Sequence, residues 1–324
     1  MFFPRGVADP GGHAGYVGDG RGIVAVDIRE GEWLWRTEGD AQPLISDGTR
    51  LAAATTQASR PNVLEVVVHD GSRQGELVLV SEPVVFPEWA TVGKRQRETF
   101  WMRAHLDDNR LRLEWTARTR YGGGAPPPAR IRREAAHDAG GVVEVDLETG
   151  SVERLTLDDA GAPAGPRRPP LDPDDLDEPW LAGNLVARLV WDVEDDEQIL
   201  ALEIVDASTG DIGSVVELAR GKGLVAQVTP DGCHLLVHTE PRPAVHALWW
   251  VFSARTGERV ATLTHDAGAH SPAILGDRAF YLVEQHEEAT THRTLRARDL
   301  EGGTLVWELP LATERGSAVR RLRE

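Results

Sequence analysis

Cysteine and histidine are common zinc ligands, and Cys233, His234 and His238 lie close together in the sequence. The alternating apolar residues around them predict a β-strand, in which the chain rises about 3.3 Å per residue. The two histidines would then lie about 13 Å apart, whereas a zinc–nitrogen bond measures about 2.0–2.1 Å. The spacing therefore predicts strand positions and no shared metal ion.

Other residues with catalytic or metal-binding chemistry do not form a recognised motif. His286, Glu287, Glu288 and His292 lie in a predicted hairpin loop and have the chemistry of metal ligands, but such a group is also typical of a solvated loop. The acidic run 172–177 is spaced like a calcium loop, but it lacks the glycine at the sixth position and the glutamate at the twelfth. No GxSxG, phosphate-loop or HExxH motif is present. We therefore expect no catalytic residues, no metal site and no cofactor.

The remaining candidates are aromatic and charged residues in three stretches without strand periodicity, 81–98, 121–140 and 158–179. Tryptophan and arginine are enriched at the centres of protein interfaces, which favours a role in binding. The partner-binding hypothesis comprises Trp89, Arg95, Arg97, Tyr121, Arg130, Arg132, Arg133, Arg167, Arg168, Asp174 and Asp175. The alternatives are solvated loops without a partner and, for Trp89, packing on the rim of the fold.

The charge of the chain limits the classes of partner. Its 52 acidic and 35 basic residues give a formal net charge of −17, so undirected attraction to nucleic acid or to an anionic membrane is not expected. Cys233 is its single cysteine, which excludes an intrachain disulfide and paired-cysteine zinc motifs. The residues from Met1 lack the apolar h-region of a leader, and no apolar run reaches roughly 18 residues, so we expect neither a leader nor a membrane span. We expect an acidic, cytoplasmic protein.

A repeated segment accounts for most of the sequence: an apolar strand, then Asp-x-x-x-Gly or a close variant, then another strand. The copies are Ile23–Asp27 with Gly31, Val66–Asp70 with Gly75, Val142–Asp146 with Gly150, Leu202–Asp206 with Gly210, Trp249–Ser253 with Gly257, and Leu295–Asp299 with Gly303. Aspartate accepts hydrogen bonds from the backbone N–H groups of the turn, and glycine supplies the positive φ that closes the hairpin. A second hairpin precedes most copies, so each unit predicts a four-stranded antiparallel sheet.

Repetition of such sheets predicts an all-β fold. We expect one domain, 1–324, that forms a six-bladed β-propeller of four-stranded antiparallel blades, with seven blades as the alternative count. The first unit is expected to begin at its second strand, Ala14–Val17, and the C-terminal strand Gly316–Arg323 to supply the missing strand and close the ring. Packing between blades is expected of the tryptophans within predicted strands, Trp101, Trp115, Trp191, Trp249 and Trp250.

The first unit carries glycines and tryptophans on both sides of its turn, at Gly15–Gly20, Ile23–Asp27, Gly31 and Trp33–Trp35. These residues resemble the repeat of the quinoprotein-like (PQQ-type) propeller superfamily, in which Asp is followed by Gly four residues later and Trp after four more. The last unit matches the same pattern, and the middle units carry other residues at the Trp place: Arg154, Ser214 and Ala261. The resemblance implies a propeller fold. Quinoprotein dehydrogenases of this superfamily use a metal beside the quinone and often adjacent cysteines, and a cysteine pair is absent from this sequence.

Strand order indicates which face carries function. In an up-and-down sheet the first–second and third–fourth turns lie at one end, so the insertions 81–98, 121–140 and 158–179 all fall at the other end. Long loops in compact domains are often functional. We predict a non-catalytic, WD40-like scaffold that uses this face to bind another protein or a peptide. The alternatives are an enzyme with a central-channel site, either a metal-dependent hydrolase or lyase or a quinoprotein-type oxidoreductase, and a channel that senses a peptide or small ligand.

Overall fold

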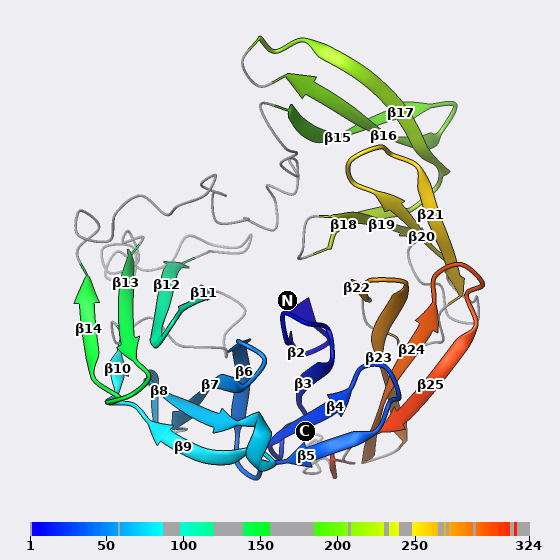
Figure 1. Ribbon diagram of the computed structural model, residues 1–324. Helices are drawn as coiled ribbons and strands as arrows, with labels where there is room; N and C mark the ends of the chain where they lie inside the picture. The colour runs from blue at the N-terminus through cyan, green and yellow to red at the C-terminus, as the bar shows by residue number, and fades with distance from the viewer. Residues whose placement is uncertain are drawn as a thin grey trace, which may run out of the picture. The chain divides into compact units, whose positions relative to one another are not determined.

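The computed structural model shows an all-β protein. The residues that it describes are 2–57, 59–86, 98–119, 139–155, 185–206, 209–229, 233–239, 248–264, 269, 272–287, 290–311 and 314–315. Their strands form six antiparallel sheets that follow one another along the chain, from blue to red in Figure 1. This succession is consistent with a β-propeller. Within the described ranges, no helix is long and apolar enough to cross a membrane.

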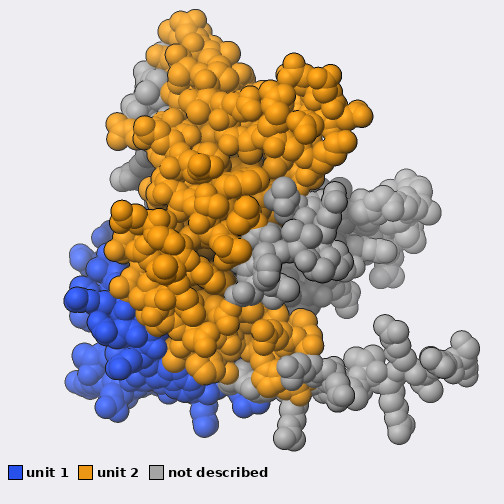
Figure 2. All heavy atoms as spheres, turned by 90° about the vertical axis from the view of Figure 1, so that its right-hand side faces the viewer, with its two compact units in different colours: residues 1, 5–167 blue, residues 2–4, 168–324 orange. Residues whose placement is uncertain are grey.

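The chain divides into two compact units, which Figure 2 shows in blue and orange. The first unit comprises residues 1 and 5–167, and the second comprises residues 2–4 and 168–324. We number the sheets 1 to 6 in chain order, so that the first unit contains sheets 1–3 and the second contains sheets 4–6.

The sheets of the first unit are built from strands that are consecutive in the sequence. Sheet 1 contains β2 (Gly6–Ala8), β3 (Ala14–Gly18), β4 (Ile23–Asp27) and β5 (Trp33–Arg36). Sheet 2 contains β6 (Ala41–Ser46), β7 (Arg50–Gln57), β8 (Arg60–Asp70), β9 (Glu76–Val80) and β10 (Val84–Val85), with the short 3-10 helix η1 (Gly71–Arg73) after β8. Sheet 3 contains β11 (Glu98–Asp107), β12 (Arg110–Thr119), β13 (Ala139–Asp146) and β14 (Val152–Leu155).

The second unit follows the same plan. Sheet 4 contains β15 (Leu185–Glu194), β16 (Glu197–Asp206) and β17 (Ile212–Gly221). Sheet 5 contains β18 (Leu224–Val228), β19 (His234–Thr239), β20 (Leu248–Ser253) and β21 (Arg259–Thr264). Sheet 6 contains β22 (Ala273–Leu275), β23 (Arg278–Glu287), β24 (Thr290–Asp299), β25 (Leu305–Pro310) and β26 (Glu314–Arg315). The N-terminal strand β1 (Phe2–Phe3) also belongs to this unit.

The turns of the repeat have the predicted chemistry. Asp27 accepts hydrogen bonds from the backbone N–H groups of Arg29 and Glu30 at its Oδ1 atom, at 2.8 and 2.9 Å. The N–H of Gly31, which has a φ of 73°, donates to the Asp27 carbonyl oxygen at 2.9 Å. Asp146 and Gly150 repeat this pattern in sheet 3. The prediction of hairpins closed by Asp and Gly is confirmed for these turns.

The first sheet differs from the prediction, because it does not begin at Ala14. The strand β2 pairs with β3 through Gly6↔Val17, Val7↔Tyr16 and Ala8↔Gly15 and occupies the place beside β3 that the sequence assigns to the C-terminal strand. A Cβ atom at Gly6 would lie 1.8 Å from the carbonyl oxygen of Tyr16, so this strand needs a glycine and has no apolar run to reveal it. The residues assigned to ring closure, 316–323, lie outside the described residues.

Most of the described tryptophans pack between sheets as predicted. Trp249 is 4% exposed, and its ring meets that of Tyr281 edge to face at 5.7 Å. Trp250 packs against a core shared by sheets 4 and 5, and Trp115 against one shared by sheets 2 and 3. The prediction for Trp191 is wrong, because this side chain is 43% exposed on β15. The side chain of Trp101 lies outside the described part of the structure.

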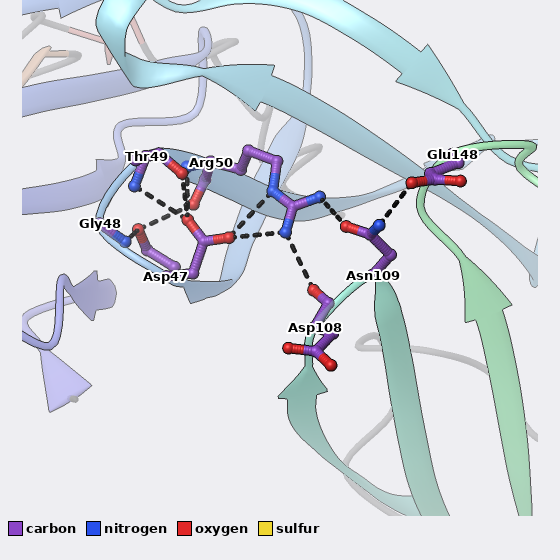
Figure 3. Close-up of polar contacts among 8 residues, drawn as sticks. Asp47, Gly48, Thr49, Arg50, Asp108, Asn109 and Glu148 are labelled. Atoms are coloured by element: carbon purple, nitrogen blue, oxygen red, sulfur yellow. Dashed lines mark hydrogen bonds and ion pairs between the residues drawn. The ribbon is translucent and has the colours of Figure 1, made fainter.

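Sheets 2 and 3 are held together by an apolar core and by a polar network at one end. The core contains Leu64, Val66, Leu111 and Val143, all buried, and burying one such side chain contributes about 1.5–3 kcal/mol. The network, shown in Figure 3, centres on Arg50 at the start of β7. Together these contacts fix how the two sheets lie against each other within the first unit.

The guanidinium of Arg50 connects the β6–β7 turn to the β11–β12 turn (Figure 3). Its Nε donates to Asp47 Oδ2 at 2.9 Å, its Nη1 to Asn109 Oδ1 at 2.8 Å, and its Nη2 to the Asp108 carbonyl oxygen at 2.9 Å. Asn109 in turn donates to Glu148 Oε1 at 2.5 Å, which adds the β13–β14 turn. Burial would raise the pKa of Asp47, but hydrogen bonds from the backbone and side chains of Arg50 and Thr49 outweigh it and lower the pKa.

Candidate functional site

A pocket lies between sheets 2 and 3 at the end opposite the Arg50 network. It is bounded by the start of β8, the start of β13, and the ends of β10 and β14, where the long connections leave the two sheets. Its volume is about 730 Å³, which is in the range of small-molecule and peptide sites. The lining residues are Arg60, Asn62, Val63, Val85, Phe86, Trp115, Gly140, Gly141, Val142, Val143, Arg154 and Leu155.

Aromatic side chains line the base of the pocket. Phe86 is 3% exposed and meets Trp115 edge to face at 5.2 Å and Phe100 at 5.0 Å. Trp115 and Phe100 stack with an interplanar angle of 13° at 6.2 Å. Phe86 and Trp115 belong to the pocket lining, and their contacts with each other and with Phe100 restrain both rings.

The segment that follows β10 is fastened to β8 by backbone and side-chain hydrogen bonds. The Phe86 N–H donates to the Asn62 carbonyl oxygen at 2.9 Å, and Asn62 Nδ2 donates to the Phe86 carbonyl oxygen at 3.1 Å. Val85 pairs with Val63 in the same ladder. These bonds hold Phe86 in place, and the exposed Arg60 at the start of β8 lies on the same wall.

Two glycines form the opposing wall beside Trp115. In the β12–β13 ladder Gly141 pairs with Trp115, and Gly140 pairs with Thr116. A Cβ atom at Gly141 would lie 3.2 Å from Trp115 Nε1, and one at Gly140 would lie 3.0 Å from the Trp115 carbonyl oxygen. The missing side chains therefore leave room for the indole ring and leave this stretch of backbone open to close approach.

Arg154 reaches the pocket because sheet 3 has a different register from the other sheets. In sheets 1, 2, 4, 5 and 6 the strand that ends at the repeat turn pairs with the strand after that turn with a register shift, whereas β13 and β14 pair without one. Trp35 and Trp307 therefore lie opposite Ala25 and Ala297, two residues before the turn aspartate. Arg154 occupies the same place in the repeat but lies opposite Val143.

A one-residue change of register turns a side chain to the other face of its sheet. Trp35 packs in the core between sheets 1 and 2, and so faces the sheet that follows its own in the chain. Arg154 faces the sheet that precedes its own, because its Nη2 donates to the carbonyl oxygen of Val85 on β10. The absence of the bulge thus brings a guanidinium group to the pocket.

The described lining of the pocket combines a few polar side chains with an apolar surface. It contains two arginines and one asparagine, and otherwise only apolar residues and glycine. Among these described lining residues there is no Ser, Thr, Cys, His, Lys, Tyr, Asp or Glu. Elsewhere in the part of the chain that is described, no group of three or more His, Cys, Asp or Glu residues could hold a metal ion.

The residues predicted from the sequence to bind a partner lie outside the described residues. They are Trp89, Arg95, Arg97, Tyr121, Arg130, Arg132, Arg133, Arg167, Arg168, Asp174 and Asp175. The stretches that contain them continue directly from Phe86 and Leu155, and another precedes Gly140, all of which line the pocket.

Sequence reasoning did not identify the pocket residues. Arg154 gave a signal, since it replaces Trp in the repeat, but the sequence did not show which face it occupies. Trp115 was predicted to pack in a core, and it does so while one side of it lines the pocket. Arg60 and Asn62 begin an ordinary strand and give no local signal.

Comparison with known proteins gives low similarities. No protein-family model matches the sequence, and no curated protein matches it. The apo structure of AtxE2 isopeptidase is 15% identical with a TM-score of 0.48, and the match covers 94% of this chain and 51% of that chain. Hsv2 of Kluyveromyces lactis is 10% identical with a TM-score of 0.37, covering 94% and 95%. Dihydro-heme d1 dehydrogenase NirN is 13% identical with a TM-score of 0.34, covering 95% and 66%.

The chain thus spans about half the length of AtxE2 isopeptidase. All three TM-scores are low, and the fold assignment rests on the six sheets themselves.

Proposed function

We propose that this chain is a non-catalytic interaction module that binds another protein or a peptide in the pocket between sheets 2 and 3. The observation that carries the proposal is the composition of the described lining: two arginines beside a rigid aromatic base, without a nucleophile or an acid–base group. Tryptophan and arginine in a concave site are the residue types that dominate binding energy at protein interfaces. The partner-binding residues predicted in 81–98, 121–140 and 158–179 extend the proposed surface.

We also propose that the six sheets are the six blades of a PQQ-type propeller ring. The repeat supports this, because Asp27, Gly31 and Trp35 in sheet 1 have counterparts in sheet 6 at the same spacing. The contact between a turn glycine and the preceding sheet, as between Gly75 and Trp35, supports radial packing of neighbouring blades. A small-angle scattering profile that fits a disc with a central channel is expected, and a profile of two separate bodies would contradict the ring.

The binding proposal is tested by capture of a partner with variants of the full chain. Arg154→Glu reverses the charge that lines the pocket, and we expect it to reduce the stoichiometric partner recovered by wild type at least tenfold. The matched control is Arg259→Glu, at an exposed position on β21 in the second unit, which should recover the partner as wild type does. Equal melting temperatures would exclude misfolding as the cause. Equal capture by both variants would place the binding surface elsewhere.

Deletion of 121–138 or of 158–179 tests the contribution of the insertions. Each deletion is expected to weaken capture while the melting temperature holds, because the proposed surface includes these residues. A wild-type chain that captures no stoichiometric partner at all would refute the interaction module.

A further inference from the structure

We infer that the pocket between sheets 2 and 3 binds the C-terminal carboxylate of a peptide whose last residue is apolar. This inference rests on the proposed function and names the chemistry of the ligand at that site. Its basis is the juxtaposition of Arg154, Arg60 and Trp115 around one cavity whose described lining contains no acidic side chain.

The charge of the described pocket lining favours an anionic ligand. The protein as a whole carries a formal net charge of −17, whereas the described lining of this cavity contains two arginines and no acidic residue. One N–H group of Arg154 donates a hydrogen bond to the Val85 carbonyl oxygen. A guanidinium has five N–H donors. Among the described residues, no second acceptor contacts the guanidinium of Arg154. One anchored bond orients the group and leaves N–H donors for an anionic ligand.

The number of cations favours a single carboxylate. Arginine and carboxylate form paired, parallel hydrogen bonds, which are stronger than those between neutral groups. A nucleic acid would require a stripe of basic residues that follows its phosphates, and the basic residues in the described part of the pocket lining are Arg60 and Arg154. A peptide ligand fits this count because it brings one charge to the site.

The apolar residues of the lining favour an apolar side chain on the residue that carries the carboxylate. Val63, Val85, Val142 and Leu155 line the same cavity as Phe86 and Trp115. A C-terminal residue carries its carboxylate and its side chain on one Cα atom, so both groups reach the pocket together. The bare backbone at Gly140 and Gly141 allows the peptide main chain to approach closely. Capture of a C-terminal carboxylate is a recognised mode of peptide binding.

The experiment uses the full chain and fluorescein-labelled peptide pools with three randomised C-terminal positions. One pool ends in a free carboxylate, a second in an amide, and a third has an internal aspartate and an amide end. Fluorescence anisotropy should show that the free-acid pool binds at least tenfold more tightly than either amide pool, and that free-acid pools with Leu or Phe fixed at the last position bind more tightly than one with Asp fixed there. Equal binding of acid and amide would overturn the inference, and preference for the third pool would assign the site to a side-chain carboxylate and overturn it too.

Variants show whether the pocket is responsible. Arg154→Gln should reduce binding of the free-acid pool to the level of the amide pool, and Arg154→Lys should give an intermediate value, because lysine keeps the charge without the paired donors. Arg259→Gln on the exposed face of β21 is the control that should not change affinity. Unchanged binding by Arg154→Gln at an unchanged melting temperature would overturn the inference.

The acidic segment that follows Leu155 provides a competing source of carboxylates. A variant with Asp172, Asp174, Asp175 and Asp177 replaced by Asn should bind the free-acid pool with wild-type affinity. Peptide binding that appears only in this variant would assign the pocket to the chain's own segment and overturn the inference.

The inference and the proposed function can fail separately. Partner capture that depends on Arg154, together with equal binding of acid and amide pools, would refute the inference and leave the interaction module standing. Discrimination between the pools with partner capture unaffected by Arg154→Glu would refute the interaction surface and leave the ligand chemistry standing.

Discussion

Turn glycines in this protein meet two requirements at a single position. Gly75 has a φ of 77°, and a Cβ atom built on it would lie 2.4 Å from Cε3 of Trp35 in the preceding sheet. Gly257 has a φ of 71°, and its Cβ would lie 3.1 Å from Val216. At these two positions the residue that closes the hairpin is therefore also the point at which the hairpin packs against the preceding sheet.

Gly75→Ala separates these two requirements. The left-handed backbone costs an alanine about 1–2 kcal/mol, and forcing a methyl group against the buried Trp35 ring costs about 1–3 kcal/mol more. We expect a loss of about 2–5 kcal/mol in the free energy of unfolding, measured by urea denaturation. Gly12→Ala is the control, because Gly12 has a φ of 69° with no atom within 4 Å of its Cβ position, and it should lose only the first part. Equal losses would show that packing against Trp35 does not constrain position 75.

The carboxylate of Asp47 makes stability depend on acidity. Its pKa is lowered from 3.8 because hydrogen bonds from Arg50 and Thr49 outweigh the effect of burial. A carboxyl group with a depressed pKa contributes stability above its unfolded pKa and loses that contribution as the pH falls through the folded value. Asp47→Asn should cost about 1–2 kcal/mol at pH 7, and the difference from wild type should shrink as the pH falls below about 3.8.

Urea denaturation between pH 7 and pH 2.5 measures this effect. Asp40→Asn is the matched control, since Asp40 lies on an exposed turn and its side chain makes no hydrogen bond among the described residues. The free energy of unfolding of this control should equal that of wild type at every pH. A constant difference between Asp47→Asn and wild type over the whole range would contradict the assignment.

At the scale of single elements, strand register decides which residues form the site. Sheet 3 pairs β13 with β14 without the bulge that the other sheets have, and this turns Arg154 towards β10. Gly141 opposite Trp115 gives the indole its place at the base of the pocket. Both features depend on how strands pair as well as on which residue stands at the paired position.

Gly141→Val tests the second feature. The added side chain would begin 3.2 Å from Trp115 Nε1 and should displace the indole from the base of the pocket. We expect at least a tenfold loss of affinity for the free-acid peptide pool, because the apolar surface is distorted. Gly213→Val on β17 is the control, since its Cβ would have only one neighbour, at 3.6 Å, and it should bind as wild type does. Wild-type affinity in Gly141→Val would show that the indole position does not matter for binding.

These elements also show what the sequence could predict. The turns at Asp27 and Asp146 were predictable because their hydrogen bonds are local, within four residues of the aspartate. The strand β2 was not, because it has three residues and a glycine forced by the Tyr16 carbonyl group. Arg154 was recognised as a departure from the repeat, but its orientation follows from a bulge that is missing between two strands. Such pairing is a property of the assembled sheet, so the sequence around Arg154 does not predict which face its side chain occupies.

At the scale of the whole molecule, the strand beside β3 in sheet 1 comes from the N-terminal side of the chain. Because β2 pairs with β3, a strand from the C-terminus is not required there. A chain truncated after Arg315 is expected to keep its free energy of unfolding within about 0.5 kcal/mol, because β2 already supplies the strand beside β3. Urea denaturation of the truncated and full chains measures this. A loss of several kcal/mol in the free energy of unfolding would show that residues 316–323 stabilise the fold, as expected of a closing strand.

The first residues of the chain belong to the second unit, which follows them by more than a hundred residues in the sequence. Phe3 is 0% exposed, and its ring lies 5.3 Å from that of Phe280, which in turn lies 5.8 Å from Trp307. Phe3→Ala should therefore cost about 3–5 kcal/mol and should accelerate hydrogen exchange in β23 and β25, far from the substitution in sequence. Leu305→Ala on the exposed face of β25 is the control and should change stability by about 0.5 kcal/mol. Faster exchange confined to the N-terminal residues would show that Phe3 does not stabilise sheet 6.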